Sequence, residues 1–274
     1  MVIATGFSGP ETLGPFIEGK IPVIWMFLLL TCRYLGLLLF LPGLGSGASG
    51  IAIRYPAVIA LSWASLQPDL LSEVPSNLAL LVLAMMSELI LGTIIGFVPR
   101  LVVAGVNSAG QFVSTAMGLN AGQVIDPTTA SQSTEIGRIL GDIAVLMFLF
   151  MGGERAMIYL ASGAKQGLFP GVFVIEEITI DFLIRETGNV ITMGVLLSAP
   201  VVVALLLVQL IMGIISKAVS TVNVFVVSFP ITVGVGLTLL LFSIASIIRV
   251  TEKEFKRLEI QIFEIIVSQQ KKSN

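Results

Sequence analysis

The chain has 274 residues, of which 55% are hydrophobic and 12% charged, with a net charge of −2. Soluble domains carry about 45–50% apolar and about 25% charged residues, so a soluble fold of this size would lack polar surface. The composition instead predicts an all-α, polytopic helical membrane protein. No histidine is present and Cys32 is the single cysteine, which excludes an internal disulfide and histidine-dependent catalytic triads.

The N-terminal third of the chain contains one full-length candidate span. Residues 21–42 meet the requirement of about 20 mostly apolar residues for crossing a bilayer as a helix, and they carry one charge, Arg33. The first 20 residues hold a single basic residue, so we expect no cleaved signal peptide. A Gly/Ser-rich turn follows at 43–50. The short apolar stretch 56–66 is either half a span or part of a helix that starts at Ile51.

The loop expected at 67–77 leads into a second span at 78–98, which has Glu88 at its centre and which Pro99 and Arg100 are expected to end. Residues 101–119 are apolar enough to enter a membrane but contain several glycines and amides. A third stretch, 139–151, is short, is interrupted at 152–155 and continues at 156–164. Residues 165–189 are acidic and typical of a loop.

The C-terminal part is simpler. Residues 190–248 hold one charge, Lys217, and predict a hairpin of two long helices with possible kinks at Pro200 and Pro230. Residues 249–274 carry six lysines and arginines and an apolar residue every three or four positions, as in an amphipathic helix. Basic residues beside a span favour the cytoplasm, so we expect a cytoplasmic C-terminus.

Two opposite charges are expected at similar depth in the membrane. A charge at the bilayer centre costs about 2.5–3.5 kcal/mol on insertion scales, so Arg33 and Glu88 are expected to pair. The pair could hold packed helices together or line a polar conduit. Gly92 and Gly96 form a small-xxx-small pattern that lets helices approach closely. The run Gln209–Gly213 resembles Glu88–Gly92, but matches this short arise by chance in Leu/Ile-rich helices.

The segment 108–127 is too polar for a lipid-facing helix and too apolar for a solvated loop. We expect irregular backbone that is buried in protein or lines a wet cavity. Phe112, Met117 and Leu119 could then close a pore by packing and dewetting. A surface loop is the alternative.

No catalytic motif emerges. Asp142 follows Gly141, but an intramembrane aspartyl protease needs a second aspartate in a Tyr-Asp dipeptide and a Gly-x-Gly-Asp turn, and both are missing from the sequence. No phosphate-binding Gly-x-x-x-x-Gly-Lys-[Ser/Thr] motif is present either. We therefore expect no enzyme activity, no cofactor and no metal.

The order of motifs resembles the FliR family of flagellar biosynthesis proteins and its type III secretion relatives, the export-gate family. The matching residues are Arg33-x-x-Gly36 with Pro42 and Arg54, Ser87-Glu88-Leu-Ile-Leu-Gly92 through Gly96-Phe97, Gly110-Gln111, Gly118, Asp126-Pro127, Asn223-Val-Phe225, Phe229-Pro230 and Gly234-Val-Gly236. Gln209, Thr232 and Glu154 depart from the residue types common in the family.

The resemblance implies a subunit of a protein-export gate in the bacterial inner membrane at the flagellar basal body, with the subunits FliP and FliQ, the export components FlhB and FlhA, and exported flagellar proteins as partners. Residues 1–189 would be FliP-like and contain a glycine-rich plug loop, residues 190–248 would be a FliQ-like hairpin, and residues 249–274 would be the cytoplasmic tail. The implied plug residues are Gly110, Gln111, Phe112, Met117, Gly118, Leu119 and Asn120. The implied assembly residues are Arg33, Glu88, Gly92, Gly96, Asp126, Pro127, Asn223, Phe225 and Pro230. The alternative function is a stand-alone transporter or channel for small solutes.

Overall fold

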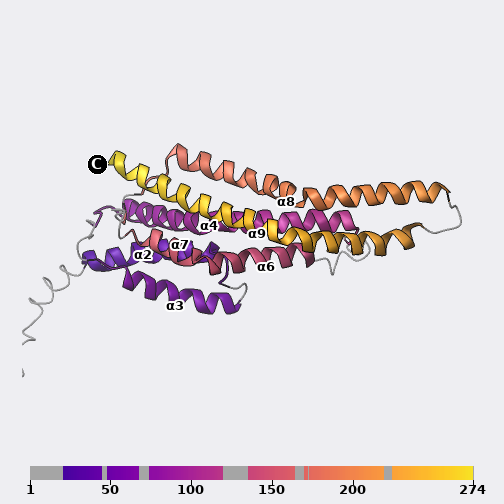
Figure 1. Cartoon of the computed structure of the whole chain (residues 1–274). Helices are drawn as coiled ribbons and strands as arrows, with labels where there is room; N and C mark the ends of the chain where they lie inside the picture. The colour runs from indigo at the N-terminus through magenta and orange to yellow at the C-terminus, as the bar shows by residue number, and fades with distance from the viewer. Residues whose placement is uncertain are drawn as a thin grey trace, which may run out of the picture. The chain divides into compact units, whose positions relative to one another are not determined.

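The computed structural model describes residues 21–44, 48–67, 74–119, 135–163, 170–171, 173–218 and 224–273, and every regular element within these ranges is an α-helix (Figure 1). The helices are α2 (Ile21–Phe40), α3 (Ala48–Ala64), α4 (Leu78–Met117), α6 (Glu135–Phe150), α7 (Gly153–Ser162), α8 (Glu177–Ala218) and α9 (Val224–Ser273). Of these, α2, α4, α8 and most of α9 are long and apolar enough to cross a membrane, and α6 with α7 could form a further, broken span. The prediction of an all-α polytopic membrane protein is confirmed.

The chain divides into two compact units, which are described one at a time. Unit 1 comprises residues 1–97, 155–177 and 262–274, and unit 2 comprises residues 98–154 and 178–261. The helix α4 begins in unit 1 and continues into unit 2 without a break in its helical backbone.

The core of unit 1 is built on α2. Its buried apolar side chains recur every three or four residues, as expected for one helix face, and are Trp25, Met26, Leu29, Leu30, Tyr34, Leu37 and Leu38. Just after the end of α3, the Ser65 hydroxyl lies 2.6 Å from the Tyr34 hydroxyl. Phe27 meets Trp63 edge-to-face with ring centroids 6.3 Å apart. These contacts fix α2 against α3.

Glycines bring α2 and α4 into backbone contact. A Cβ atom at Gly92 would overlap the carbonyl oxygen of Arg33, and one at Gly96 would overlap that of Leu37. From the other side, a Cβ at Gly36 would overlap the carbonyl oxygen of Leu89. Small residues allow this approach where lipid gives no hydrophobic drive for helix association. The small-xxx-small pattern therefore lies at a helix contact.

The core of unit 2 combines four helices. Its buried apolar residues follow helical spacing on each of them: Val106, Ala109, Val113 and Met117 on α4, Ile136, Leu140 and Ala144 on α6, Leu197, Val201 and Leu205 on α8, and Ile247 on α9. Glycine permits a close crossing here as well, because a Cβ at Gly110 would lie 2.6 Å from the Cα of Gly137. Phe148 and Phe255 add an aromatic contact with centroids 5.3 Å apart.

The predicted end of the second span at Pro99 is wrong, because α4 runs for 40 residues with Pro99 inside it. An interior proline removes one backbone hydrogen bond and strains the turn before it, at about 3 kcal/mol or more. The buried residues on both sides of Pro99, among them Val98, Leu101 and Val102, supply packing that offsets this cost.

The prediction of irregular backbone over 108–127 is also wrong for residues 108–117, which form the last turns of α4. Their polar side chains are satisfied within the helix itself. The Gln111 amide donates to Asn107 Oδ1 at 2.6 Å, and the Ser108 and Thr115 hydroxyls donate to backbone carbonyls four residues earlier. Residues 120–127 lie outside the described part of the chain.

The helix boundaries in the second half of the chain match the sequence predictions in one case and differ in two. The acidic stretch assigned to a loop is helical from Glu177 onward. The basic tail is no separate helix, since α9 runs unbroken from Val224 to Ser273 and its sequence offers no glycine or proline breaker after Gly236. The predicted interruption at 152–155 is confirmed, because α6 ends at Phe150 and α7 begins at Gly153.

We predict that alanine at Gly92 destabilises the protein while alanine at Gly213 does not. Gly92 touches backbone, whereas a Cβ at Gly213, in the similar run on α8, meets nothing within 4 Å. Gly213→Ala should be neutral or stabilising by up to about 1 kcal/mol through helix propensity. Thermal unfolding of the purified full-length chain in mild detergent measures both variants. Equal melting temperatures would show that the α2–α4 contact tolerates a methyl group.

Candidate functional site

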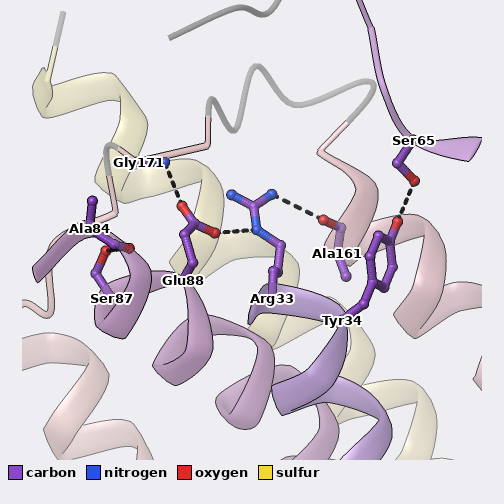
Figure 2. Close-up of polar contacts among 8 residues, drawn as sticks. All are labelled: Arg33, Tyr34, Ser65, Ala84, Ser87, Glu88, Ala161 and Gly171. Atoms are coloured by element: carbon purple, nitrogen blue, oxygen red, sulfur yellow. Dashed lines mark hydrogen bonds and ion pairs between the residues drawn. The ribbon is translucent and has the colours of Figure 1, made fainter. Parts of the chain in front are cut away.

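The two intramembrane charges pair directly. In Figure 2, Arg33 on α2 and Glu88 on α4 point toward each other, and Arg33 Nε donates to Glu88 Oε2 at 2.5 Å. Both side chains have 0% exposure. The pair therefore lies in the interior of unit 1, and in the folded chain it contacts protein rather than lipid or solvent.

Backbone groups from a third segment complete this arrangement. Arg33 Nη1 donates to the carbonyl oxygen of Ala161, at the end of α7, at 3.0 Å. Glu88 Oε1 accepts from the amide N–H of Gly171 at 2.6 Å (Figure 2). Gly171 has φ near +91°, a conformation that favours glycine. We call these four residues, Arg33, Glu88, Ala161 and Gly171, the ion-pair anchor.

The anchor joins three stretches of chain that are remote in sequence. A buried charge is tolerated when it is paired and its remaining hydrogen-bonding atoms are satisfied. Here each charged side chain also has a backbone partner of the matching kind: a carbonyl for the guanidinium and an N–H for the carboxylate. The two charges of the anchor are therefore not interchangeable. A carboxylate cannot accept from the Ala161 carbonyl, and a guanidinium cannot donate to the Gly171 N–H.

The second candidate site is the C-terminus of α4, where the predicted plug begins. Gly118, with φ near +81°, ends the helix. The N–H of Gly118 donates to the Thr115 carbonyl at 3.0 Å, and the N–H of Leu119 donates to the Ser114 carbonyl at 3.1 Å. This pair of bonds is the Schellman arrangement, which needs a left-handed residue after the helix. Gly118 is thus required by the helix end itself.

Both arms of the hairpin hold this helix end. The Gln209 side-chain amide on α8 donates to the Ala116 carbonyl at 2.7 Å. The Thr232 hydroxyl on α9 lies 3.4 Å from the Met117 carbonyl oxygen. The last carbonyls of a helix have no partner within the helix, so Gln209 caps α4. The Thr232 hydroxyl makes its shorter bond to the Phe229 carbonyl, at 3.0 Å, and makes only a longer contact with the end of α4.

The predicted plug residues occupy different environments. Met117 is 1% exposed and packs against Gly236 of α9, so it is a core residue. Phe112 and Leu119 are 39% and 38% exposed. Gly110 contacts α6, and Gln111 bonds to Asn107. Asn120 lies outside the described residues.

The predicted assembly residues are only partly brought together. Arg33, Glu88, Gly92 and Gly96 share the α2–α4 contact. Pro230 lies inside α9, and Phe225 lies in its first turn, with its side chain outside the description. Asp126, Pro127 and Asn223 also fall outside the described residues.

Sequence reasoning missed several partners. Ala161 and Gly171 contribute only backbone atoms, and no residue type signals such a contact. A half-buried ion pair in unit 2, between Glu186 and Arg257 at 2.7 Å, was also missed. Its signal was available, since the two charges flank opposite ends of the apolar stretch 190–248 and the hairpin brings those ends together.

We predict that Glu88→Gln strongly destabilises the protein, whereas Glu135→Gln does not. Breaking a buried pair leaves Arg33 as an uncompensated charge, at about 3–5 kcal/mol, a large part of the typical stability of about 5–15 kcal/mol. Glu135 forms a matched but exposed pair with Arg138, and such pairs contribute about 0–1 kcal/mol.

Membrane-inserted yield and thermal unfolding of the two variants provide the measurement. The paired replacement Arg33→Met with Glu88→Leu should lose less than either single change, because no lone charge remains. A Glu88→Gln variant as stable as Glu135→Gln would contradict a structural role for the pair.

Known proteins that are similar to this chain come from the same family that its sequence motifs resemble. The chain is 26% identical over 239 residues to the flagellar biosynthetic protein FliR of Caulobacter vibrioides, covering 86% of this chain and 94% of that protein. It is 27% identical over 212 residues to FliR of Bacillus subtilis, covering 73% and 76%. It is 28% identical over 166 residues to the Yop proteins translocation protein T of Yersinia pestis, covering 58% and 62%.

A family model for bacterial export proteins, family 1, matches residues 24–258. This range includes the ion-pair anchor, the whole of α4 and α8, and α9 as far as Leu258. The resemblance to the FliR and type III export-gate family is thereby confirmed, and the chain belongs to family 1 of the bacterial export proteins.

Proposed function

We propose that the chain is a non-enzymatic, structural and gating subunit of the flagellar type III protein export gate, which passes unfolded flagellar proteins across the bacterial inner membrane. The observation that carries this proposal is the family match over residues 24–258. Relatives named for flagellar biosynthesis and for type III secretion both align with the chain. The flagellar assignment rests on FliR relatives that align over most of both chains.

The lengths of the helices support a role within an assembly. At 1.5 Å per residue, the 40 residues of α4 and the 42 of α8 extend over roughly 60 Å, about twice the hydrocarbon thickness of a bilayer. Tilts within the usual range of 0–40° do not fit helices of this length into the bilayer. Part of each helix must therefore meet something other than lipid tails.

Apolar side chains are exposed even at the ends of these helices, so whichever part of each lies outside the hydrocarbon region needs protein partners. At the start of α4, Leu78 is 75% exposed and Leu83 is 64% exposed, and near the end of α8, Ile214 is 63% exposed. Outside the hydrocarbon region, such surface is stable only when other protein covers it. We infer that FliP and FliQ subunits cover it, with FlhB and FlhA as further components at the flagellar basal body. In this arrangement residues 1–189 pack as a FliP-like region and residues 190–248 as a FliQ-like hairpin.

A stand-alone transporter for small solutes is less well supported. It would use polar groups at membrane depth to line a path. Arg33 and Glu88 have no exposed side-chain surface and are directed at each other and at backbone. Neither is available to a solute in this conformation.

We propose further that the segment beginning where α4 ends, at Gly118 and Leu119, forms the barrier of the closed gate. The Schellman end and the Gln209 cap hold the start of the segment in a defined place, with Thr232 beside it. Met117, just before the segment, is buried in the core of unit 2. The segment continues in sequence as Asn-Ala-Gly-Gln-Val-Ile at 120–125, in which Val124 and Ile125 could join Leu119 in excluding water from a narrow path.

We also place the C-terminus in the cytoplasm. Six lysines and arginines follow the last apolar stretch, between Arg249 and Lys272, and basic residues within about 15–20 residues of a span favour the cytoplasmic side. The exposed pairing of Lys256 with Glu252 agrees with a solvated face on this part of α9.

The proposed assembly predicts that the chain extracts as part of a larger complex. Gentle solubilisation followed by native mass measurement should give a mass above 29.1 kDa that requires copies of other small membrane proteins. Deleting the chain should abolish secretion of flagellar proteins, and the wild-type chain should restore it. A lone monomer or a symmetric homodimer, with secretion intact in the deletion strain, would support the transporter reading.

The proposed barrier predicts a leak when the segment is shortened. Deleting residues 120–125 spares Gly118, Leu119 and the core of unit 2, so the chain should still assemble. Cells should then take up a small, normally excluded solute or show raised membrane conductance. A deletion of equal length at 68–73, between α3 and α4, is the control. Normal assembly with no more leak than this control would rule out the segment as the barrier.

The proposed orientation predicts the behaviour of reporters fused after Asn274. A fluorescent protein that folds only in the cytoplasm should be bright. Alkaline phosphatase, which is active only after export, should be inactive in the same position. The reverse pattern would place the C-terminus outside.

A further inference from the structure

The helix α6 buries one face in the core of unit 2 and leaves the opposite face exposed. Its buried residues recur with helical spacing and are Ile136, Gly137, Leu140, Gly141, Ala144 and Phe148. The opposite side of the helix carries the exposed residues Glu135, Arg138, Ile139, Asp142, Leu146 and Leu149. We call these six residues the outer face of α6.

The outer face is largely apolar around Asp142. Ile139 is 56% exposed, Leu146 is 52% exposed and Leu149 is 37% exposed. The helix face that a protein turns toward water is mainly polar, whereas exposed apolar surface of this kind is covered by lipid or by other protein. Asp142 lies three residues after Ile139 and four before Leu146, so apolar side chains border its carboxylate on both sides along the helix.

No cation in the described part of the chain is paired with Asp142. The nearest in sequence is Arg138, one turn earlier, and its Nη2 donates to Glu135 Oε2 at 2.5 Å. Among the residues that the structure describes, Asp142 makes neither a hydrogen bond nor an ion pair. The outer face therefore holds two carboxylates and one guanidinium, with one negative charge in excess.

Lipid does not suit this face, because α6 with α7 could form a broken span. Ionisable residues within spans face protein or a wet cavity, since a charge among acyl chains is costly. A protein surface that is apolar and brings one cation would cover the leucines and neutralise Asp142 together. The chain already uses this solution at Arg33 and Glu88, where two closely packed helices pair their charges.

We propose that the outer face of α6 binds a membrane helix of a different subunit, and that this helix places a lysine or arginine opposite Asp142. The inference rests on the proposed function, because it requires an assembly, and it adds the surface and the chemistry of one contact. A two-fold contact between copies of this chain would use the same face on both partners and would bring two Asp142 carboxylates together. The partner is therefore a chain of different sequence.

Removal of the charge tests the contact. Asp142→Asn keeps the size of the side chain, and the isolated chain should melt at an unchanged temperature because Asp142 bonds to no described residue. Gentle extraction with native mass measurement should show that the partner is lost or bound about tenfold or more weakly. Asp142→Glu keeps the charge and should retain the partner. Asp181→Asn, at an exposed aspartate of α8, is the matched control and should also retain it.

The outcomes separate this inference from the proposed function. A partner mass that is unchanged in Asp142→Asn would overturn the contact and leave the proposed function standing. Loss of secretion from an intact complex would also overturn it, because the carboxylate would then serve a wet path. An added mass equal to a second copy of this chain would replace the different subunit by a homo-oligomer. A wild-type chain that extracts alone would contradict the proposed function and this inference with it.

A photo-reactive residue in place of Leu146, one turn after Asp142, identifies the partner in intact membranes. Illumination should join it to another membrane protein, within a peptide that has a lysine or arginine among apolar residues. Asp142→Asn in the same chain should reduce this adduct about tenfold or more. Adducts with lipid alone would overturn the proposal, and so would an adduct of equal yield with and without the carboxylate.

Discussion

The buried pairing of Arg33 with Glu88 is the interaction on which the packing of unit 1 depends. Two charges at membrane depth are tolerated only when each is matched, and here they meet where the backbones of α2 and α4 are in contact. Glycines at positions 36, 92 and 96 permit that contact. The backbone groups of Ala161 and Gly171 then draw a third stretch of chain to the same place. One electrostatic requirement thus organises three segments.

The same combination of small residues and satisfied polar groups recurs in unit 2 at the end of α4. Gly110 allows α6 to cross closely, and Gly118 ends the helix in a left-handed turn. The Gln209 side chain of α8 then caps the Ala116 carbonyl, and Thr232 of α9 lies beside the Met117 carbonyl. The end of α4, held beside α8 and α9, gives the proposed barrier segment a fixed starting point.

Much of the fold follows from the sequence because hydropathy and length decide where long helices form in membrane proteins. The Arg33–Glu88 pair was predictable from charge cost alone, and the break before Gly153 from two adjacent glycines. Prediction from local sequence was wrong where tertiary packing or hydrogen bonds within the helix stabilise a helix that proline or polar residues would be expected to end. Pro99 lies within a continuous helix because the residues around it are buried, and the polar run 108–117 is helical because its side chains bond within the helix. The backbone partners Ala161 and Gly171 could not be predicted, since any residue supplies the same atoms.

The direction of the ion-pair anchor is its most specific property, and exchanging the two charges tests it most directly. In the double variant Arg33→Glu with Glu88→Arg, the pair remains complementary, but the carboxylate faces the Ala161 carbonyl and the guanidinium faces the Gly171 N–H. Folded yield and flagellar protein secretion should then stay as low as in a variant with one charge removed. Full recovery of both would contradict a directional anchor and would reduce the site to a simple attraction between two helices.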